Sequence, residues 1–184
     1  MKISVTEIAL IGIFSALAVA GAYLFIPIHN VEIFTAIIFL SGLLLGQRNG
    51  MLVGVIASSI FSTFNPFGIS PLPLFIAQAL SRALVGYLGG LYAKLNLGKR
   101  RFWITAIAFG VAGLLLTWVY ILLAFSSSIF SMGFSLEQMK IWFAGGIVSY
   151  LILTVSNILI FALVLPFVSR ELNRMGLLKQ VNIS

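Results

Sequence analysis

Six apolar runs fill most of the chain, and only short polar breaks separate them. They cover residues 8–27, 33–46, 50–64, 72–93, 102–125 and 141–167. Of the 184 residues, 61% are hydrophobic and 8% are charged, and few soluble domains of this size could bury so much apolar surface. Because runs of about 20 residues cross a bilayer as α-helices, the sequence predicts an all-α polytopic membrane protein. We expect one domain over residues 1–184, built as a bundle of six transmembrane helices.

The second and third runs are short for transmembrane helices, at about 14–15 residues each. Runs of this length are typical of re-entrant segments or of helices tucked inside a bundle. Glycines four residues apart surround the turn between the two runs, and we expect them to serve close internal packing. They are Gly42, Gly46, Gly50 and Gly54. If neither short run crossed the membrane, the sides assigned to the remaining loops would not change.

The basic residues divide very unequally between the two sides that alternating spans define. One side receives both termini and two loops, with nine lysines and arginines, whereas the other side receives Lys140 alone. The nine are Lys2, Arg48, Lys94, Lys99, Arg100, Arg101, Arg170, Arg174 and Lys179. Because cytoplasmic loops are enriched in lysine and arginine, we expect both termini to be cytoplasmic. The net charge of +7 then follows from membrane topology, and no nucleic-acid partner is expected.

One arginine, Arg82, interrupts the fourth run, in the stretch "FIAQALSRALVGYLGG". A charge at the centre of a span costs ~2.5–3.5 kcal/mol on insertion scales, so Arg82 needs a partner. The chain has no aspartate and its four glutamates, Glu7, Glu32, Glu137 and Glu171, lie at or beyond the ends of the runs. An internal carboxylate partner is therefore not expected. Three interpretations stay open: Arg82 bonds within the bundle, faces a partner protein, or presents its guanidinium to a ligand.

Polar and aromatic residues in the last three runs lie at similar depths. At ~1.5 Å per residue, Gln78 is about 9 Å and Arg82 about 15 Å below the outer end of the fourth run, and Trp118 is about 10 Å down the fifth. Aromatic and polar groups that converge on a concavity form small-molecule sites, so we expect a substrate site here. Its candidate residues are Phe75, Gln78, Arg82, Trp118, Tyr120, Tyr150, Thr154 and Asn157. Trp103 and Trp142 lie nearer the ends of their runs, where an interfacial aromatic belt is the simpler interpretation.

Two outer loops add further candidates. The stretch "NPFGISPLP" holds three of the five prolines, which predicts a rigid, irregular loop, and such loops often line sites. This loop contributes Asn65 and Phe67 as candidate substrate-binding residues. The stretch "IPIHNVEIF" contributes His29, Asn30 and Glu32. Either a solvated loop or a lid over an external cavity explains the second loop.

Small residues recur every four positions along one face of the first run, at Gly12, Ala16 and Ala20. Such a face lets another helix approach closely, because association in lipid depends on van der Waals packing. Two interpretations stay open: packing inside the bundle, or docking of a partner membrane protein.

Several kinds of chemistry are missing from the sequence. There is no cysteine or aspartate and only one histidine, which excludes an H-E-x-x-H zinc site and an aspartyl dyad. The chain also lacks a G-x-x-x-x-G-K phosphate loop. We expect no metal site, no cofactor and no enzymatic activity. The alternatives to a binding subunit are a solitary facilitator or channel, for which polar stripes should run the whole depth, and a small intramembrane enzyme.

The chain resembles a known family over residues 8–168. The resemblance rests on "ALAVA" in the first run, on "IPIHNVEIFTAIIFLSGLLLGQRNGMLVGVIASSIFS", and on the proline-rich loop before the fourth run. These features are similar to the substrate-binding S component of an energy-coupling factor (ECF) vitamin transporter. The resemblance implies a six-helix bundle in a prokaryotic plasma membrane that binds a vitamin at its outer face.

The same resemblance implies partners. They are a transmembrane T component and two cytosolic ATPases, and the T component would contact Gly12, Ala16 and Ala20. The site would be lined by the outer parts of the last three helices and by the first and third outer loops. No substrate-specific motif is evident, so riboflavin, pantothenate, cobalamin and a pyrimidine precursor all stay open.

Overall fold

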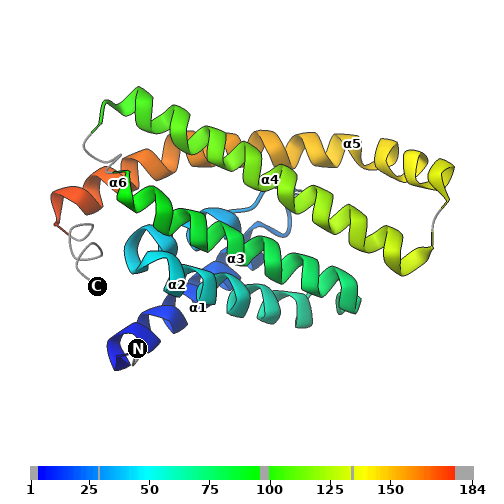
Figure 1. The fold of residues 1–184 in the computed structure, drawn as a ribbon, viewed down its shortest axis with the longest axis horizontal. Coiled ribbons are helices and arrows are strands. Elements are labelled where there is room, and N and C mark those ends of the chain that lie inside the picture. The colour runs from blue at the N-terminus through cyan, green and yellow to red at the C-terminus, as the bar shows by residue number, and fades with distance from the viewer. Residues whose placement is uncertain (1–3, 29, 96–99, 134, 177–184) are drawn as a thin grey trace.

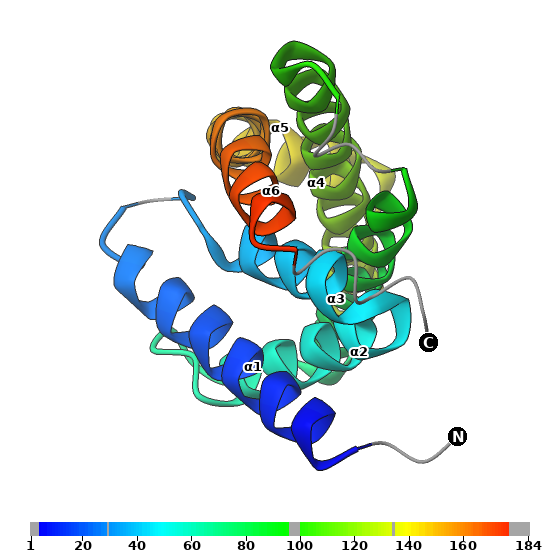
Figure 2. The ribbon, with the colours of Figure 1, turned by 90° about the vertical axis from the view of Figure 1, so that its left-hand side faces the viewer.

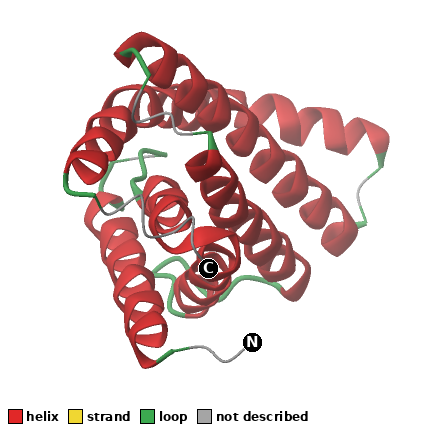
Figure 3. Ribbon diagram, turned by 60° about the vertical axis from the view of Figure 1, so that its left-hand side comes forward, coloured by secondary structure: helices red, strands yellow, loops and turns green. Residues whose placement is uncertain are grey.

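The computed structural model describes residues 4–28, 30–95, 100–133 and 135–176, and these contain helices and loops but no strand (Figure 3). The elements are α1 (Val5–Phe25), α2 (Phe34–Thr63), α3 (Leu72–Lys94), α4 (Phe102–Met132), α5 (Leu136–Leu159), η2 (Ile160–Val164) and α6 (Leu165–Arg174). Over these residues, five helices are long and apolar enough to cross a membrane, the last being the continuous stretch Leu136–Arg174. The all-α membrane class is therefore confirmed.

The second and third predicted runs belong to one element, α2, which is broken at Gly46. Its φ of 84° and ψ of 173° are not helical, and glycine adopts such angles without the steric cost that a Cβ brings. A Cβ added to Gly50 would lie 2.6 Å from the Cα of Gly42, whereas eight residues of straight helix span about 12 Å. The segments 34–45 and 47–63 therefore fold back on each other. Five candidate spans stand where six were predicted, and six complete crossings remain a prediction.

Glycines hold α2 and α3 together at very short range. A Cβ added to Gly86 would lie 1.9 Å from the carbonyl oxygen of Gly50, and one added to Gly54 would lie 2.1 Å from that of Arg82. A Cβ on Gly42 would also meet the Gly86 carbonyl, at 2.0 Å. The predicted role in close internal packing is confirmed for Gly42, Gly50 and Gly54, whereas Gly46 forms the break in α2.

The segment 34–45 occupies the centre of the bundle. Every residue from 34 to 39 is buried, and a helix that is apolar all round is expected to be covered on all sides. The ring of Phe39 lies 5.7 Å from that of Phe109 in α4 and 5.1 Å from that of Phe161 in η2. The expectation that a short run is tucked inside the bundle is therefore confirmed for this segment.

The starts of α1 and α4, the turn at Gly46, the end of α3 and the C-terminal helix lie at one end of the bundle, opposite the α4–α5 turn (Figure 1). Three hydrogen bonds connect these parts: Asn49 to Glu7 at 3.0 Å, Lys94 to Gln47 at 3.1 Å, and Arg170 to the Arg100 carbonyl at 2.9 Å. Six of the nine basic residues predicted for one side are described and belong to these parts, whereas Lys2, Lys99 and Lys179 lie outside the described residues.

The helices form two groups, seen end-on in Figure 2, with α1, α2 and α3 in one and α4, α5 and α6 in the other. Packing of α3 against α4 joins the groups. A capping box of Ser4 with Glu7 fixes the start of α1, and another of Ser135 with Gln138 fixes the start of α5. Residues 26–28 and 30–33, the described part of the connection from α1 to α2, are called the segment 26–33 below.

Candidate functional site

The connecting segment 26–33 reaches α5 on the other side of the bundle. The Ser156 hydroxyl donates a hydrogen bond of 3.2 Å to the carbonyl oxygen of Asn30, which is 126 residues away in the sequence. The φ of Asn30 is 55°, a left-handed conformation that asparagine tolerates better than most residues. The segment thus brings Asn30 and Glu32 between α3 and α5.

Arg82 is buried, with 5% of its surface exposed, and it bonds to Glu32 of this segment and to Thr35 at the start of α2. Its Nη2 lies 3.2 Å from Oε1 and 3.4 Å from Oε2 of Glu32, and its Nη1 donates to the hydroxyl of Thr35. The guanidinium carbon also lies 5.1 Å from the ring centroid of Phe34 and 4.5 Å from that of Tyr120. An ion pair, a hydroxyl and two aromatic faces together offset the cost of burying this charge.

The expectation that Arg82 has no carboxylate partner is therefore wrong. It rested on counting depth along the helices, with the first loop placed wholly outside. The loop instead enters the bundle, and Glu32 comes with it. The bonds of Arg82 to Glu32 and Thr35 support the interpretation of Arg82 as a residue bonded within the bundle, and its contact with a ligand stays a prediction.

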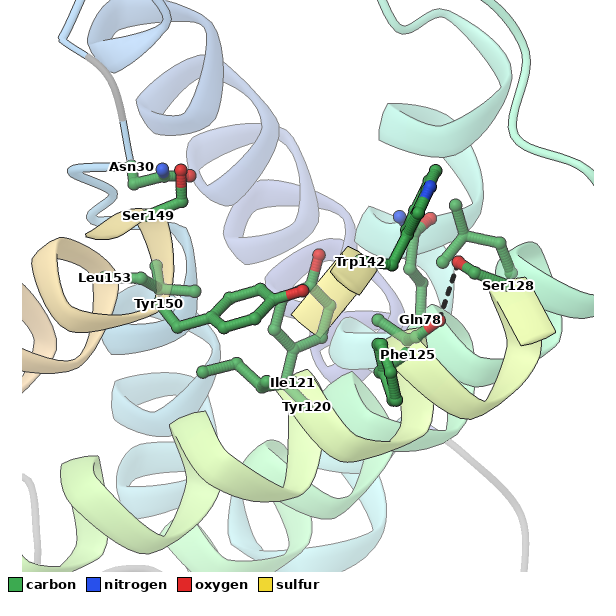
Figure 4. Close-up of a pocket in the computed structure, with 12 residues that line it drawn as sticks. Asn30, Gln78, Tyr120, Ile121, Phe125, Ser128, Trp142, Ser149, Tyr150 and Leu153 are labelled. Atoms are coloured by element: carbon green, nitrogen blue, oxygen red, sulfur yellow. Dashed lines mark hydrogen bonds between the residues drawn. The ribbon is translucent and has the colours of Figure 1, made fainter. Parts of the chain in front are cut away.

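Two cavities flank the segment 26–33. The first, of about 250 Å³, lies between α3, α4 and α5 and includes Gln78, Phe125, Trp142 and Tyr150 in its wall. The second, of about 430 Å³, lies between the end of α1, the end of α2 and the segment itself. Asn30, Tyr120 and Leu153 line both cavities, so they form the boundary between them. Figure 4 shows the side chains of the first cavity converging from the segment, α4 and α5.

Six of the predicted site residues line these cavities: Asn30, Glu32, Phe67, Gln78, Tyr120 and Tyr150. The amide oxygen of Gln78 accepts hydrogen bonds from Ser62 at 2.5 Å and from Ser70 at 3.3 Å, which ties α3 to α2 and to the loop between them. His29 lies outside the described residues.

Six other candidates line neither cavity: Asn65, Phe75, Arg82, Trp118, Thr154 and Asn157. The Thr154 hydroxyl bonds to the Tyr150 carbonyl of its own helix at 2.7 Å. The Asn157 amide donates to the Thr117 hydroxyl at 3.0 Å, deeper between α4 and α5. The Asn65 side chain accepts from the Phe67 amide at 2.9 Å and so shapes its own loop. Bonds within the chain thus use the polar groups of Thr154 and Asn65 and the side-chain nitrogen of Asn157, whereas the buried Asn157 oxygen has no partner within the described residues.

Sequence reasoning missed Trp142, which lines the first cavity, and assigned it to an interfacial belt. Trp142 was assigned to an interfacial aromatic belt because the sixth run was expected to begin at residue 141. The helix α5 begins earlier, at Leu136, so Trp142 lies within the helix and not at its end. The pattern "SLEQ" at Ser135–Gln138 is a capping-box signature that could have located this start. Phe125 and Ser149 were also missed.

The small-residue face of α1 points away from the bundle. Gly12, Ala16 and Ala20 are exposed, while a different face, with Ser15 and Ala18, is buried. The interpretation of this face as packing inside the bundle is therefore wrong for the described chain. The other interpretation, docking of a partner, stays a prediction.

Fold and site together define a membrane-embedded helical bundle with two neighbouring cavities of a size that suits small molecules. The family model for the ECF transporter substrate-specific component matches residues 6–165, and the chain belongs to this family. Comparison with curated proteins gives no match, and comparison with solved structures gives none either. The chain is thus the substrate-binding membrane subunit of an ECF importer, a transport protein and not an enzyme. Membership also implies a T component and ATPases as partners.

Proposed function

We propose that the chain captures a vitamin-like small molecule from outside the cell, in the two cavities on either side of segment 26–33. The observation that carries this proposal is that two cavities, of about 250 and 430 Å³, lie side by side and share Asn30, Tyr120 and Leu153 as lining residues. Aromatic walls with a few placed polar groups are typical of small-molecule sites. Gln78 and Tyr150 supply such groups in the first cavity, and Glu32 supplies one in the second.

The orientation of the site follows from charge. The basic residues of the turn at Gly46, of the end of α3 and of the C-terminal helix lie at one end of the bundle. The positive-inside rule favours a cytoplasmic position for this end, which supports a topology with both termini inside and the cavities toward the outer face. The fold-back at Gly46 supports a path in which the segments 34–45 and 47–63 act as one inward and one outward pass, giving six passes in all.

Delivery of the substrate requires the partners that the family implies. The exposed face of Gly12, Ala16 and Ala20 supports docking of the T component on α1, because small side chains permit close helix contact in lipid. Two cytosolic ATPases would then drive release to the inside.

The test is identification of the bound compound. The full chain is purified from its host in mild detergent and denatured, and the released small molecules are identified by mass spectrometry. We expect one compound in near-stoichiometric amount, lost in Tyr120→Ala and retained in Trp103→Ala, because Trp103 is 75% exposed near the start of α4. Absence of any such compound, together with no binding of candidate vitamins by calorimetry, would contradict the proposal.

A further inference from the structure

The charge that faces the candidate site belongs to Glu32 and not to Arg82. Among the described residues, Glu32 is the one charged side chain in the wall of either cavity. Arg82 lies behind it, with 6% of its side chain exposed against 22% for Glu32. Both terminal nitrogens of Arg82 already donate to Glu32 or Thr35. A ligand therefore meets a carboxylate whose negative charge is balanced from behind.

Asn30 supplies a hydrogen-bond donor beside the Glu32 carboxylate, which is an acceptor. The side-chain nitrogen of Asn30 is buried and has no hydrogen-bond partner within the described chain, and Asn30 lines both cavities. An unsatisfied buried amide costs free energy unless a ligand or water accepts from it. The Gln78 oxygen is already used by two serines. The polar groups that remain for a ligand thus include the acceptor oxygens of Glu32 and the donor nitrogen of Asn30.

The wall of the first cavity does not include Glu32, and it contains several aromatic side chains beside aliphatic ones. Tyr120, Phe125, Trp142 and Tyr150 all contribute to its wall, and Figure 4 shows the Tyr120 and Tyr150 rings reaching into it. Aromatic side chains pack well against flat rings, in offset or edge-to-face arrangements. A planar ring fits this wall better than a branched chain does.

We infer that the substrate is a planar nitrogen heterocycle that offers an N–H group to Glu32 and an acceptor atom to Asn30, and that it carries no carboxylate or phosphate. This inference rests on the proposed function and names its substrate class. An N–H donor gains a charge-assisted hydrogen bond from a carboxylate, whereas an anionic group in the same space is repelled. Of the four candidates left open by the sequence, riboflavin and the pyrimidine precursor satisfy these conditions. Pantothenate carries a carboxylate and cobalamin a phosphate, so neither does.

The experiment is calorimetry on the purified full chain, stripped of endogenous compound, with four probes: riboflavin, 4-amino-5-hydroxymethyl-2-methylpyrimidine, pantothenate and cobalamin. We expect one of the two heterocycles to bind at least tenfold more tightly than either pantothenate or cobalamin. Glu32→Gln keeps the size of the side chain and one acceptor oxygen but removes the charge. It should weaken the bound heterocycle at least tenfold and improve binding of pantothenate. Glu137→Gln, in the first turn of α5 and outside both walls, should change neither affinity.

The outcomes separate the inference from the proposed function. Tightest binding of pantothenate or cobalamin, or release of a compound with a carboxylate or phosphate, overturns the inference and leaves the proposed function intact. Unchanged heterocycle affinity in Glu32→Gln also overturns the inference. If no probe binds and no compound is released, both fail together. Should Glu32→Gln not fold, the preference of the unmodified chain among the four probes and the chemical groups of the released compound decide the matter.

Discussion

Glu32 and Arg82 are 50 residues apart in the sequence, yet the Nη2 atom of Arg82 lies 3.2 Å from Oε1 of Glu32. Thr35 bonds to both partners, so three polar side chains form one cluster beside the second cavity. The cluster fixes the segment 26–33 to α3, and the bond from Ser156 to the Asn30 carbonyl fixes the same segment to α5. The shape of the candidate site thus depends on a connecting segment held at both sides.

Loss of Arg82 should destabilise the fold. Arg82→Met leaves Glu32 without its counter-charge, and removal of one partner of a buried pair costs ~3–5 kcal/mol. Since Glu32 keeps 22% of its side chain exposed, we expect the lower part of that range. The melting temperature in detergent should fall by several degrees, as thermal unfolding followed by intrinsic fluorescence would show.

The double variant Arg82→Met with Glu32→Met is the matched control, because it removes both charges and should recover most of the stability. Arg82→Lys adds a second comparison, since it keeps the charge but loses the two-nitrogen geometry. We expect Arg82→Lys to fold and to bind substrate more weakly by calorimetry. A single variant Arg82→Met that melts at the temperature of the unmodified chain would show that the pair does not support the fold.

Close packing of α2 on α3 gives a second prediction. In Gly86→Ala, the new Cβ would lie 1.9 Å from the carbonyl oxygen of Gly50, and a backbone atom cannot move aside cheaply. Overpacking typically costs ~1–3 kcal/mol, and a clash between backbones belongs at or above the upper end. We expect little folded protein, measured as the monodisperse fraction in size-exclusion chromatography.

The control for this prediction is Gly145→Ala in α5, where an added Cβ meets nothing within 4 Å. Alanine is the better helix former by about 1 kcal/mol, so Gly145→Ala should express at least as well as the unmodified chain. Equal yields of folded Gly86→Ala and Gly145→Ala would mean that the contact between α2 and α3 is looser than the glycine geometry indicates.

Hydropathy and charge predicted the class of fold because both are averages over many residues. The membrane assignment, the helical class and the gathering of described basic residues at one end of the bundle each depend on whole segments. The path of the chain at Gly46 is different. The break between the runs 33–46 and 50–64 predicted a turn there, but hydropathy could not show how far each short run passes through the bundle, because that depends on tertiary packing such as the burial of residues 34–39.

The sequence predicted only part of the candidate site, because helical depth can be counted from the sequence whereas the position of a loop cannot. Depth along a helix grouped Gln78, Tyr120 and Tyr150, and all three line the first cavity, while their contact with a substrate stays a prediction. Depth could not place Glu32, because the position of a loop depends on tertiary contacts such as the bond between Asn30 and Ser156. Helical depth also does not show from which side of the helix a side chain projects. Trp118 was therefore expected at the site, although it lines neither cavity.

Orientation in the membrane can be tested with single cysteines, since the chain has none of its own. Ile69→Cys lies in the loop before α3, where Ile69 is 76% exposed, and Leu95→Cys follows α3 at the opposite end, where Leu95 is 54% exposed. An impermeant maleimide added to intact cells should label the first and not the second. The reverse pattern would place the basic end outside and the cavities toward the cytoplasm.

If the T component docks on α1, a change on the exposed face of α1 should prevent assembly with the T component and leave substrate binding intact. Ala16→Trp with Ala20→Trp places two bulky side chains on the exposed small-residue face, where close helix contact becomes impossible. We expect the variant to bind substrate alone but not to co-purify with the T component and ATPases. Leu151→Trp with Val155→Trp in α5 has the same spacing at positions 54% and 52% exposed, and it should assemble normally. Intact assembly of the α1 variant would place the docking surface elsewhere.

Tryptophan fluorescence can report on the first cavity, because the chain has three tryptophans and only Trp142 lines it. An aromatic contact beyond simple burial contributes ~0.5–1.5 kcal/mol, so Trp142→Ala should weaken binding of the identified substrate by up to about tenfold. Trp142→Phe keeps an aromatic face and should retain most of the affinity while abolishing the fluorescence change on binding. Trp103→Phe should alter neither quantity, since Trp103 is 75% exposed near the start of α4. A fluorescence change that persists in Trp142→Phe and disappears in Trp118→Phe would move the substrate away from this wall, toward the face of α4 that the sequence alone had favoured.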